Sequence, residues 1–358
     1  MSSSSRQSGV DDLTVANIRD AYRAIEYYYD QGWTDGLPVV PPIAEKVQEF
    51  VEYAGRDPQE IVAEMAHLDR RCTVELAAIN AVMAGCLKEY FPVVLASLAC
   101  FKNGLALVQS TTGQAQSMII NGPVRERLNF NSKAGVFGPG FRANATVSRA
   151  FRLIVMNALG VRPHEFDQGT QGTPARYGFC IAENEEDSPW EPLHVERGWP
   201  ARSSTVTAHF ARSCLHVENR ISNRPEQVLM TIADSLSYAG VWYTGWCRGS
   251  TVVMGPTHAQ LLERQGWSKA DVKQFLWEHW GRRKGDLRAW GEYDQEVVHA
   301  PFPGAYADGP DDEFLRFGQS PESLTLVVAG APTAGVSAVI THFSPNLNTV
   351  VIQEAAQT

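Results

Sequence analysis

The stretch "GVFGPGFRANATVSRAFRLIVMNALG", residues 135–160, carries the clearest local signal in the chain. Its first six residues hold three glycines and a proline, which favour a loop over regular structure. The residues that follow repeat apolar side chains at helical spacing, so a helix is predicted over residues 143–159, with Gly160 as its stop. The stretch therefore predicts a glycine-rich loop that leads into the N-terminus of a half-buried helix.

One face of this predicted helix is polar. Asn144, Ser148 and Arg152 recur at intervals of four residues and share one stripe, while Arg142 lies at the helix start. A helix N-terminus binds anions through its free backbone N–H groups, and glycines let a ligand approach the backbone. The alternative is a glycine turn that only caps a structural helix whose arginines pair with surface acids. The predicted substrate-binding residues are Asn121, Gly138, Gly140, Arg142 and Asn144.

Outward from this stretch, the chain is mainly helical on the N-terminal side and alternates between strands and helices on the C-terminal side. Predicted helices are 14–30, 43–53, one after Asp57-Pro58, two buried helices across 73–101, 225–238, 258–265 and 269–280. Predicted strands are 117–120, 177–181, 205–210, 251–254, 324–329 and 337–343. We expect an α/β (or α+β) protein, with a helical N-terminal part and a mixed sheet covered by helices in the C-terminal part.

The predicted divisions follow from the same pattern. Residues 1–13 read as a disordered tail, residues 14–160 as a mainly helical part with the glycine-rich loop, and residues 161–358 as an α/β part. A segment rich in proline, glycine and aspartate at residues 299–321 predicts a long loop.

Composition narrows the class of protein. The 358 residues are 44% apolar and 20% charged, as in an ordinary globular protein. The net charge of −9 disfavours nucleic acid and anionic membranes as partners. The six cysteines form no C-x-x-C pair and the N-terminus has no apolar leader, so a cytoplasmic location is expected. The most apolar stretch, residues 76–101, is interrupted by Lys88, Glu89 and Pro92 and predicts no membrane span.

A second stretch, "CIAENEEDSPWEPLHVERGW" at residues 180–199, packs six carboxylates around His194. Crowded carboxylates raise one another's pKa, which is how a general acid is made, so the predicted catalytic residues are His194, Glu183 and Glu186. We expect Trp190 to be buried and His194 to lie close to one of the glutamates. Carboxylates with histidine also suit Fe, Mn or Zn. The alternative is a solvated acidic loop whose charge is relieved by Arg197 and Arg202.

Other candidates for chemistry lie further along the chain. His209 and His216 flank a predicted strand end and are candidate metal ligands. Cys214 and Cys247 are candidate reactive thiols, because a neighbouring arginine lowers a thiol pKa. His67 and His279 are predicted to be structural residues of helices. No nicotinamide or flavin fingerprint is present, so the cofactor is unknown, with a divalent metal as one alternative.

Four motifs together resemble an uncharacterised family of bacterial proteins. They are GWTDGLPVVPP (32–42), NGP with GPGFRAN (121–123 and 138–144), AENEEDSPWEPLHVERG (182–198) and GWSKADVKQFLWEH (266–279). The resemblance covers residues 32–338, and some members of that family are encoded beside a small protein with a UGSC motif. It implies shared architecture and a small partner subunit. The segment VAGAPTAGVSAV (328–339) departs from the family's glycine-rich C-terminal pattern, which puts a shared C-terminal site in doubt.

The sequence predicts an enzyme, a hydrolase or lyase, that cleaves or eliminates a bond in a small anionic organic substrate by acid/base or metal-assisted chemistry. Two alternatives remain open. One is a non-catalytic scaffold subunit of a two-component enzyme, and the other is a thiol-dependent redox enzyme. The expected partners are a small-molecule substrate, further copies of the chain in a homo-oligomer, and the small subunit, with no nucleic acid and no membrane.

Overall fold

A computed structural model of the chain describes residues 15–102, 105–238, 249–290, 309–342 and 347–353. Cys247 and residues 299–308 of the predicted long loop lie outside these ranges. Within them, no helix is both long enough and apolar enough to cross a membrane.

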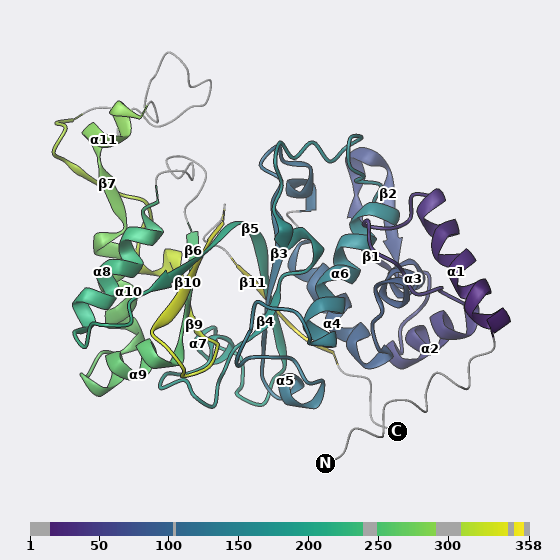
Figure 1. The fold of residues 1–358 in the computed structure, drawn as a ribbon, viewed down its shortest axis with the longest axis horizontal. Helices are drawn as coiled ribbons and strands as arrows, with labels where there is room; N and C mark the ends of the chain where they lie inside the picture. Colours follow the sequence, from purple (N-terminus) through teal and green to yellow (C-terminus); the bar gives the residue numbers. More distant parts are fainter. Residues whose placement is uncertain (1–14, 103–104, 239–248, 291–308, 343–346, 354–358) are drawn as a thin grey trace.

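A mixed sheet forms the centre of the described structure, with helices packed on it from both sides (Figure 1). Its strands run in the order β4-β3-β5-β10-β6-β9, and β11 pairs with β5. Their bounds are β3 Ala115–Asn121, β4 Cys180–Ala182, β5 Thr205–Glu218, β6 Gly249–Met254, β9 Leu324–Val328, β10 Val336–His342 and β11 Asn348–Val351. The pairs β3–β4 and β6–β9 are parallel and the others are antiparallel, which confirms the predicted mixed α/β class.

Successive residues of the strands face different cores. In β3, Ile120 packs with the N-terminal helices, whereas Ile119 belongs to an inner core on the opposite face. In β10, Ile340 shares that inner core, whereas Val339 packs with the C-terminal helices. The sheet curls around the inner core, and its two ends approach each other where the backbone of Asn184, just after β4, donates to Val328 of β9 at 2.7 Å.

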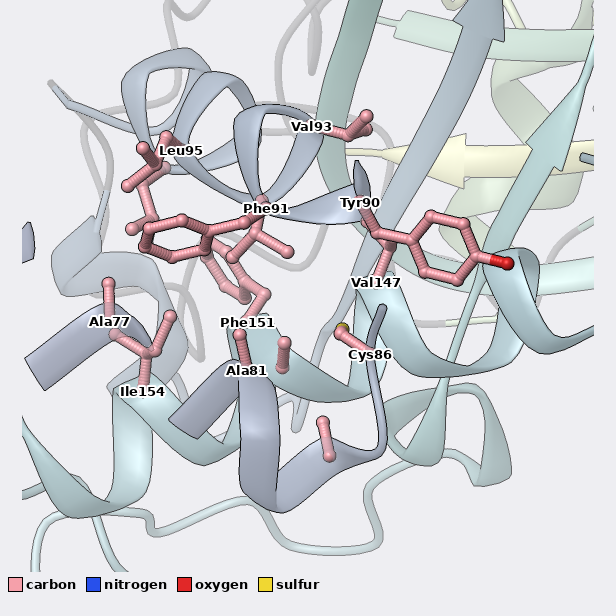
Figure 2. Packing of buried hydrophobic residues seen from close by; sticks show 14 of the residues in the cluster. Ala77, Ala81, Cys86, Tyr90, Phe91, Val93, Leu95, Val147, Phe151 and Ile154 are labelled. Carbon is pink, nitrogen blue, oxygen red and sulfur yellow. The ribbon is translucent and has the colours of Figure 1, made fainter. Parts of the chain in front are cut away.

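The N-terminal helices form one layer against β3 and β5. They are α1 Val15–Asp30, α2 Ala44–Ala54, α3 Val74–Ala84, α4 Phe91–Cys100 and α6 Arg142–Asn157. Thr73 caps α3 by accepting from the backbone of Leu76, and Gly85, at a φ of 87°, ends it. Figure 2 shows Phe91 of α4 packed with Phe151 of α6 in the centre of this layer. The helix that the opening stretch predicts is therefore the one that joins this layer to the sheet.

A second group of helices covers β6, β9 and β10. They are α8 Pro225–Leu236, α9 Pro256–Arg264 and α10 Lys269–His279. A capping box between Ser268 and Asp271 starts α10. Short elements complete the described chain: α5 Val124–Arg127, α7 Leu193–Glu196, α11 Lys284–Ala289, the pair β7 Gly281–Arg283 and β8 Phe314–Arg316, and 3-10 turns at Lys88–Tyr90, Leu105–Gln109 and Pro321–Ser323.

Four sequence predictions of local structure are corrected. The segment after Asp57-Pro58 forms no helix but an antiparallel pair, β1 Ile61–Met65 and β2 Arg70–Thr73, because β-branched residues favour strands and Asp69 turns the chain at a φ of 49°. His67 therefore lies in the 3-10 turn Ala66–Leu68 between these strands and bonds Gln109 at 2.7 Å.

The other two corrections concern strands. The strand predicted from residue 177 begins at Cys180, because Pro174 starts a 3-10 turn, Pro174–Tyr177, that Thr173 caps. The predicted long loop contains a strand in its described half, since β8 pairs with β7 there. His279 ends α10 as expected, with Nδ1 at 2.8 Å from the carbonyl of Phe275.

Candidate functional site

Three strands bring polar side chains together at one edge of the sheet. The carboxyl ends of the parallel strands β3 and β4 meet there, and β5 begins opposite the end of β3, with Thr205 paired to Asn121. Strand ends of this kind are where open α/β sheets place ligands. We call the group the Glu183 cluster. It comprises Asn121, Arg125, Glu183, Glu185, Glu186, His194 and Thr205.

Glu183 lies at the centre of this cluster and is almost fully buried, at 1% exposure. Its Oε2 accepts hydrogen bonds from Asn121 Nδ2 at 2.5 Å and from the backbone of Leu193 at 2.8 Å. Burial raises the pKa of Glu183, and this effect outweighs the opposing influence of Lys269 and of the two hydrogen bonds. The side chain is thus biased toward its neutral, proton-donating form.

Arg125, from the short helix after β3, relieves much of the negative charge. Its guanidinium lies 3.0 Å from Glu185 and 2.8 Å from Glu186, and it also donates to the carbonyl of Glu183 at 2.8 Å. The hydrogen bond from Arg125 lowers the pKa of Glu186. Sequence reasoning missed this arginine, although its place directly after the NGP turn at a strand end was an available signal.

The remaining negative charge of the acidic segment is neutralised by lysines that lie far away in the sequence. Lys269 and Lys273 of α10 contact the carboxylate of Glu196 at 2.6 and 3.0 Å. Burial alone would raise the pKa of Glu196, but the two lysines outweigh it and the pKa is lowered. Arg197, which the sequence suggested for this task, instead donates to the carbonyl of Leu347 at 2.7 Å.

His194 is fully buried within the cluster. Its Nδ1 lies 3.9 Å from Glu185 Oε1, which confirms the predicted proximity to a glutamate, and its Nε2 lies 3.3 Å from the carbonyl of Ala201. Trp190 is half-buried rather than buried, because its indole reaches out to donate to the carbonyl of Trp267 at 3.2 Å. The acidic segment is therefore folded onto the sheet edge with Glu183 and His194 buried, while Glu186 and Glu191 remain exposed.

Several atoms of the cluster keep unused hydrogen-bonding capacity. Within the cluster, the buried side-chain atoms without a partner among the described residues are Asn121 Oδ1, Glu183 Oε1, His194 Nδ1 and Thr205 Oγ1. A buried polar atom left unpaired costs about 1–3 kcal/mol of folding free energy, so these unpaired atoms make the cluster less stable than a fully hydrogen-bonded one. The arrangement can accept and hold protons, but its central side chains are closed to solvent.

The candidate metal ligands on β5 are not brought together. His209 is buried, with its ring 4.5 Å from that of His342, whereas His216 is exposed and lies 6.0 Å from the ring of Phe137. Seven residues along a strand separate the two by roughly 23 Å at about 3.3 Å per residue. Across the described ranges, no group of three or more His, Cys, Asp or Glu side chains is arranged to hold a metal ion.

The predicted substrate-binding residues at the start of α6 lie in two different environments. Arg142 is exposed and donates to the carbonyl of Gly85 at 2.9 Å, and Gly138 and Gly140 are exposed on the preceding loop. Asn144 is buried and holds the backbone of Asn131 and Cys180 through its side-chain amide. Asn144 is thus occupied with backbone groups, and Arg142 is occupied with the carbonyl of Gly85.

Of the two candidate thiols, one can be placed. Cys214 lies on the exposed half of β5, and partial burial of its sulfur raises the pKa of the thiol to about 11. That direction is opposite to the lowered pKa that a reactive thiol needs. Cys72, Cys86 and Cys100 are buried, with thiol pKa values raised to about 12 by burial.

A pocket of about 810 Å³ lies at the C-terminal half of α6, between the GWTDG segment and residues 162–177. We call it the arginine pocket. At its wall, one oxygen of Asp167 accepts hydrogen bonds from Arg152 and Arg176, each at 2.6 Å. Burial alone would raise the pKa of Asp167, but the two arginines outweigh it and the pKa is lowered. Asp167 is therefore held as a carboxylate that keeps two guanidinium groups side by side.

The charge balance of this pocket is positive. Asp35, from the GWTDG motif, pairs with Arg149 through two hydrogen bonds of 2.8 Å. The charged residues that line the pocket are Asp35, Arg152, Arg162, Glu165, Asp167 and Arg176. Arg149 lies outside this lining and takes up the charge of Asp35. Three arginines then face the two remaining acids, which leaves one positive charge in excess. Sequence reasoning placed Arg152 on a polar stripe but missed Asp167 and Arg176, although the glycines at 169 and 172 signalled an irregular, close-packed segment.

Comparison of the chain with protein-family models, with curated proteins and with solved structures found no match. The candidate sites are thus defined by geometry alone. They lie toward opposite ends of β3, because Gln116 at its beginning donates to the carbonyl of Arg176 at 3.2 Å, whereas Asn121 at its end belongs to the Glu183 cluster.

Proposed function

We propose that the protein is an enzyme that binds a small organic anion in the arginine pocket and cleaves or eliminates a bond in it. The observation that carries the proposal is the shared contact of Arg152 and Arg176 with one oxygen of Asp167. A guanidinium has five N–H donors in a planar fork, so an arginine that spends one on Asp167 keeps others for a ligand. In agreement, Arg176 Nε is buried without an acceptor among the described residues.

The size of the pocket supports a small molecule as the ligand. Its volume of about 810 Å³ lies within the range of roughly 300–1,000 Å³ that is usual for small-molecule sites. The excess positive charge of the pocket favours an anion, and the planar fork of arginine favours a carboxylate or phosphate over a halide. A small organic carboxylate or phosphate ester therefore fits both the space and the charge.

Proton transfer in this pocket is best assigned to His164. It lines the pocket and has a φ of 67°, a backbone conformation that costs energy for a residue other than glycine. Its backbone N–H donates to the carbonyl of Asp167 at 3.3 Å, which ties it to the residue that holds both arginines. Of the predicted catalytic residues, Glu183 and His194 are buried in their own cluster and Glu186 is bound to Arg125, so they would act only on a ligand that reaches that cluster.

One observation supports a second candidate function, that of a non-catalytic scaffold subunit. Leu37, Val40 and Ile43, in and just after the GLPVVPP segment, are large apolar residues with 42–54% of their surface exposed. Exposed apolar groups of this kind suit a protein interface. The chain would then be a scaffold subunit that presents the anion to a small partner carrying the reactive thiol or selenol. For a thiol of this chain itself, the raised pKa of Cys214 offers no support.

Calorimetric titration with a panel of small mono- and dicarboxylates, phosphate and simple phosphate esters tests the binding step. We expect at least one anion to bind, and Arg176→Gln to weaken it about ten- to hundredfold, as loss of a charged hydrogen bond predicts. The matched control is Arg282→Gln, which removes an arginine 3.4 Å from Asp234, outside the residues that line the pocket. Unchanged binding in Arg176→Gln, or no binding of any anion, would contradict the proposal.

Turnover separates the two functions once a ligand is known. The enzyme proposal expects the purified chain alone to convert the ligand, and His164→Gln to lower kcat while leaving the dissociation constant nearly unchanged. The scaffold proposal expects binding without conversion until the small partner is added.

A further inference from the structure

Helix α1 presents an outer face of charged and aromatic side chains that are exposed in the described structure. Its inner side is held by Tyr28, which packs against the N-terminal core, and by Tyr29, whose hydroxyl donates to the carbonyl of Gly36 at 3.4 Å. On the outer side, Tyr22 and Tyr27 expose 67% and 53% of their surface. The ring of Tyr27 is fixed in that direction by edge contacts with Tyr28 and Trp33 at 5.9 and 6.0 Å.

The outer face has an ordered charge pattern. A shallow depression on it is lined by Arg19, Tyr22, Arg23, Glu26, Tyr27 and Asp30, which recur at helical spacing. Both arginines lie in the first half of the face and both acids in the second half. These six positions are symmetric about the bond between Ala24 and Ile25.

This pattern does not serve the helix itself. The helix dipole favours acids near the N-terminus and cations near the C-terminus, and α1 has neither an acid in its first turn nor a cation in its last. The distribution of Arg19 and Arg23 against Glu26 and Asp30 runs the opposite way. The contact recorded within the helix, Arg23 with Asp20 at 3.5 Å, joins two side chains that are each more than 70% exposed and so stabilises little.

We propose that α1 is the interface of a two-fold symmetric dimer of this chain, in which the α1 helices of two copies pack antiparallel. In that arrangement Arg19 faces Asp30 of the partner, Arg23 faces Glu26 of the partner, and Tyr22 faces Tyr27 of the partner. A two-fold axis brings the same patch of both copies together, so each contact occurs twice. Opposite charges then meet at every charged position of the face.

The aromatic pairs add apolar contact on both sides of the charged centre of the interface. Tyrosine is enriched at protein interfaces because it offers a large ring with a polar tip. The two Tyr22–Tyr27 pairs flank the line of charges, and Ile18, which is 45% exposed, adds apolar surface at the edge. A single helix pair of about 24 Å in length makes a small interface, so the dimer dissociates on dilution and weakens as salt screens its charges.

Sedimentation equilibrium of the full chain over a range of concentrations tests this interface. We expect the wild-type chain to dimerise, and both Arg19→Glu/Arg23→Glu and Glu26→Arg/Asp30→Arg to raise the dimer Kd at least about 100-fold, since like charges then face each other. An equimolar mixture of the two variants restores a dimer, because every contact between an all-acidic and an all-basic face is favourable. The control, Lys46→Glu/Arg71→Glu, reverses two exposed cations elsewhere and leaves the dimer unchanged.

A cross-link provides a measurement that does not depend on charge. A chain with Tyr22→Cys, mixed with a chain with Tyr27→Cys, is expected to form a disulfide-linked pair under mild oxidation, and two chains with Tyr22→Cys are not. A monomeric wild-type chain at the highest concentration, equal dimerisation of the reversed variants, or no dimer in their mixture would each overturn the proposal.

Discussion

Glu183 and Asp167 are both buried carboxylates next to β3, yet their surroundings push their pKa values in opposite directions. Glu183 receives neutral donors, the amide of Asn121 and the backbone of Leu193, and burial prevails. Asp167 receives two guanidinium groups, and their charge prevails over burial. The difference teaches that burial alone does not set the direction in which the pKa of a carboxyl shifts. The charge of the groups that donate to the carboxyl also decides it.

The same difference assigns the two sites different tasks. A charged Asp167 fixes Arg152 and Arg176 in place while leaving the pocket one positive charge in excess, which suits anion binding. A carboxyl at Glu183 that is biased toward its neutral form holds the acidic segment against the sheet edge at little electrostatic cost. We therefore regard Asp167 as the positioning residue of the ligand pocket and Glu183 as the centre of a closed, proton-holding cluster.

The largest effect is expected from Asp167→Asn. It leaves the buried guanidinium of Arg152 and the half-buried one of Arg176 without their counter-charge, which costs about 3–5 kcal/mol of unfolding free energy. Glu183→Gln keeps the shape and removes a carboxyl that is biased toward neutrality, so it costs less than about 1 kcal/mol. Urea unfolding of the two variants beside the wild-type chain measures both values. Equal costs for both would contradict the opposite pKa shifts assigned to the two carboxyls.

An intermediate effect is expected in the pH dependence of these same variants. The pKa of Glu183 is raised in the folded chain, so its contribution to stability is complete below the unfolded pKa of about 4.3 and is lost as pH rises through the folded pKa. Glutamine does not titrate. The stability of Glu183→Gln relative to wild type should therefore improve as pH rises through that window. A relative stability that falls with rising pH would contradict the raised pKa.

For Asp167 the sign is reversed. Its pKa is lowered, so its contribution is present above the unfolded pKa of about 3.9 and is lost as pH falls through the folded pKa. The cost of Asp167→Asn should shrink toward strongly acid pH. Urea unfolding over a pH series distinguishes this behaviour from a cost that is independent of pH, which would point to lost packing instead.

The smallest effect is expected from Arg142→Ala, which sets the sequence hypothesis against the structure. The glycine-rich loop predicted Arg142 as a ligand-binding residue. In the structure, Arg142 is exposed and its guanidinium donates to the carbonyl of Gly85. We expect stability to change by less than about 0.5 kcal/mol and anion affinity to stay within about twofold. A tenfold loss of affinity would restore the loop as the binding site and count against the arginine pocket.

Local signals accounted for most of the fold. The long helices have clear periodicity and caps, such as Thr73 before α3 and the Ser268 box before α10, and their predicted positions agree with the structure to within about two residues. The β1–β2 pair was missed because its residues also fit a helical pattern, and only a turn at Asp69 decides between the two. Tertiary pairing overrode propensity there.

The sites were less accessible from sequence. Asn121 and Glu183 could be placed at strand ends and His194 near a glutamate, and the structure brings the three into one cluster. Arg125 is joined to Glu186 across sixty-one positions of sequence, and Arg149 is joined to Asp35 across more than a hundred. Such pairs depend on how the layers stack, and no local pattern specifies them. The sequence therefore could not predict that the arginines of the pocket lie together at one site.

The opposed protonation of the two carboxylates can be measured directly by a pH titration of their side-chain carboxyl carbons by NMR. Glu183→Gln and Asp167→Asn supply the assignments, because each removes one resonance. The account predicts that the Glu183 resonance titrates above the usual glutamate value of about 4.3 and that the Asp167 resonance titrates below the usual aspartate value of about 3.9. Titration of Glu183 at or below its usual value, or of Asp167 above its own, would contradict the opposite pKa shifts assigned to the two carboxyls.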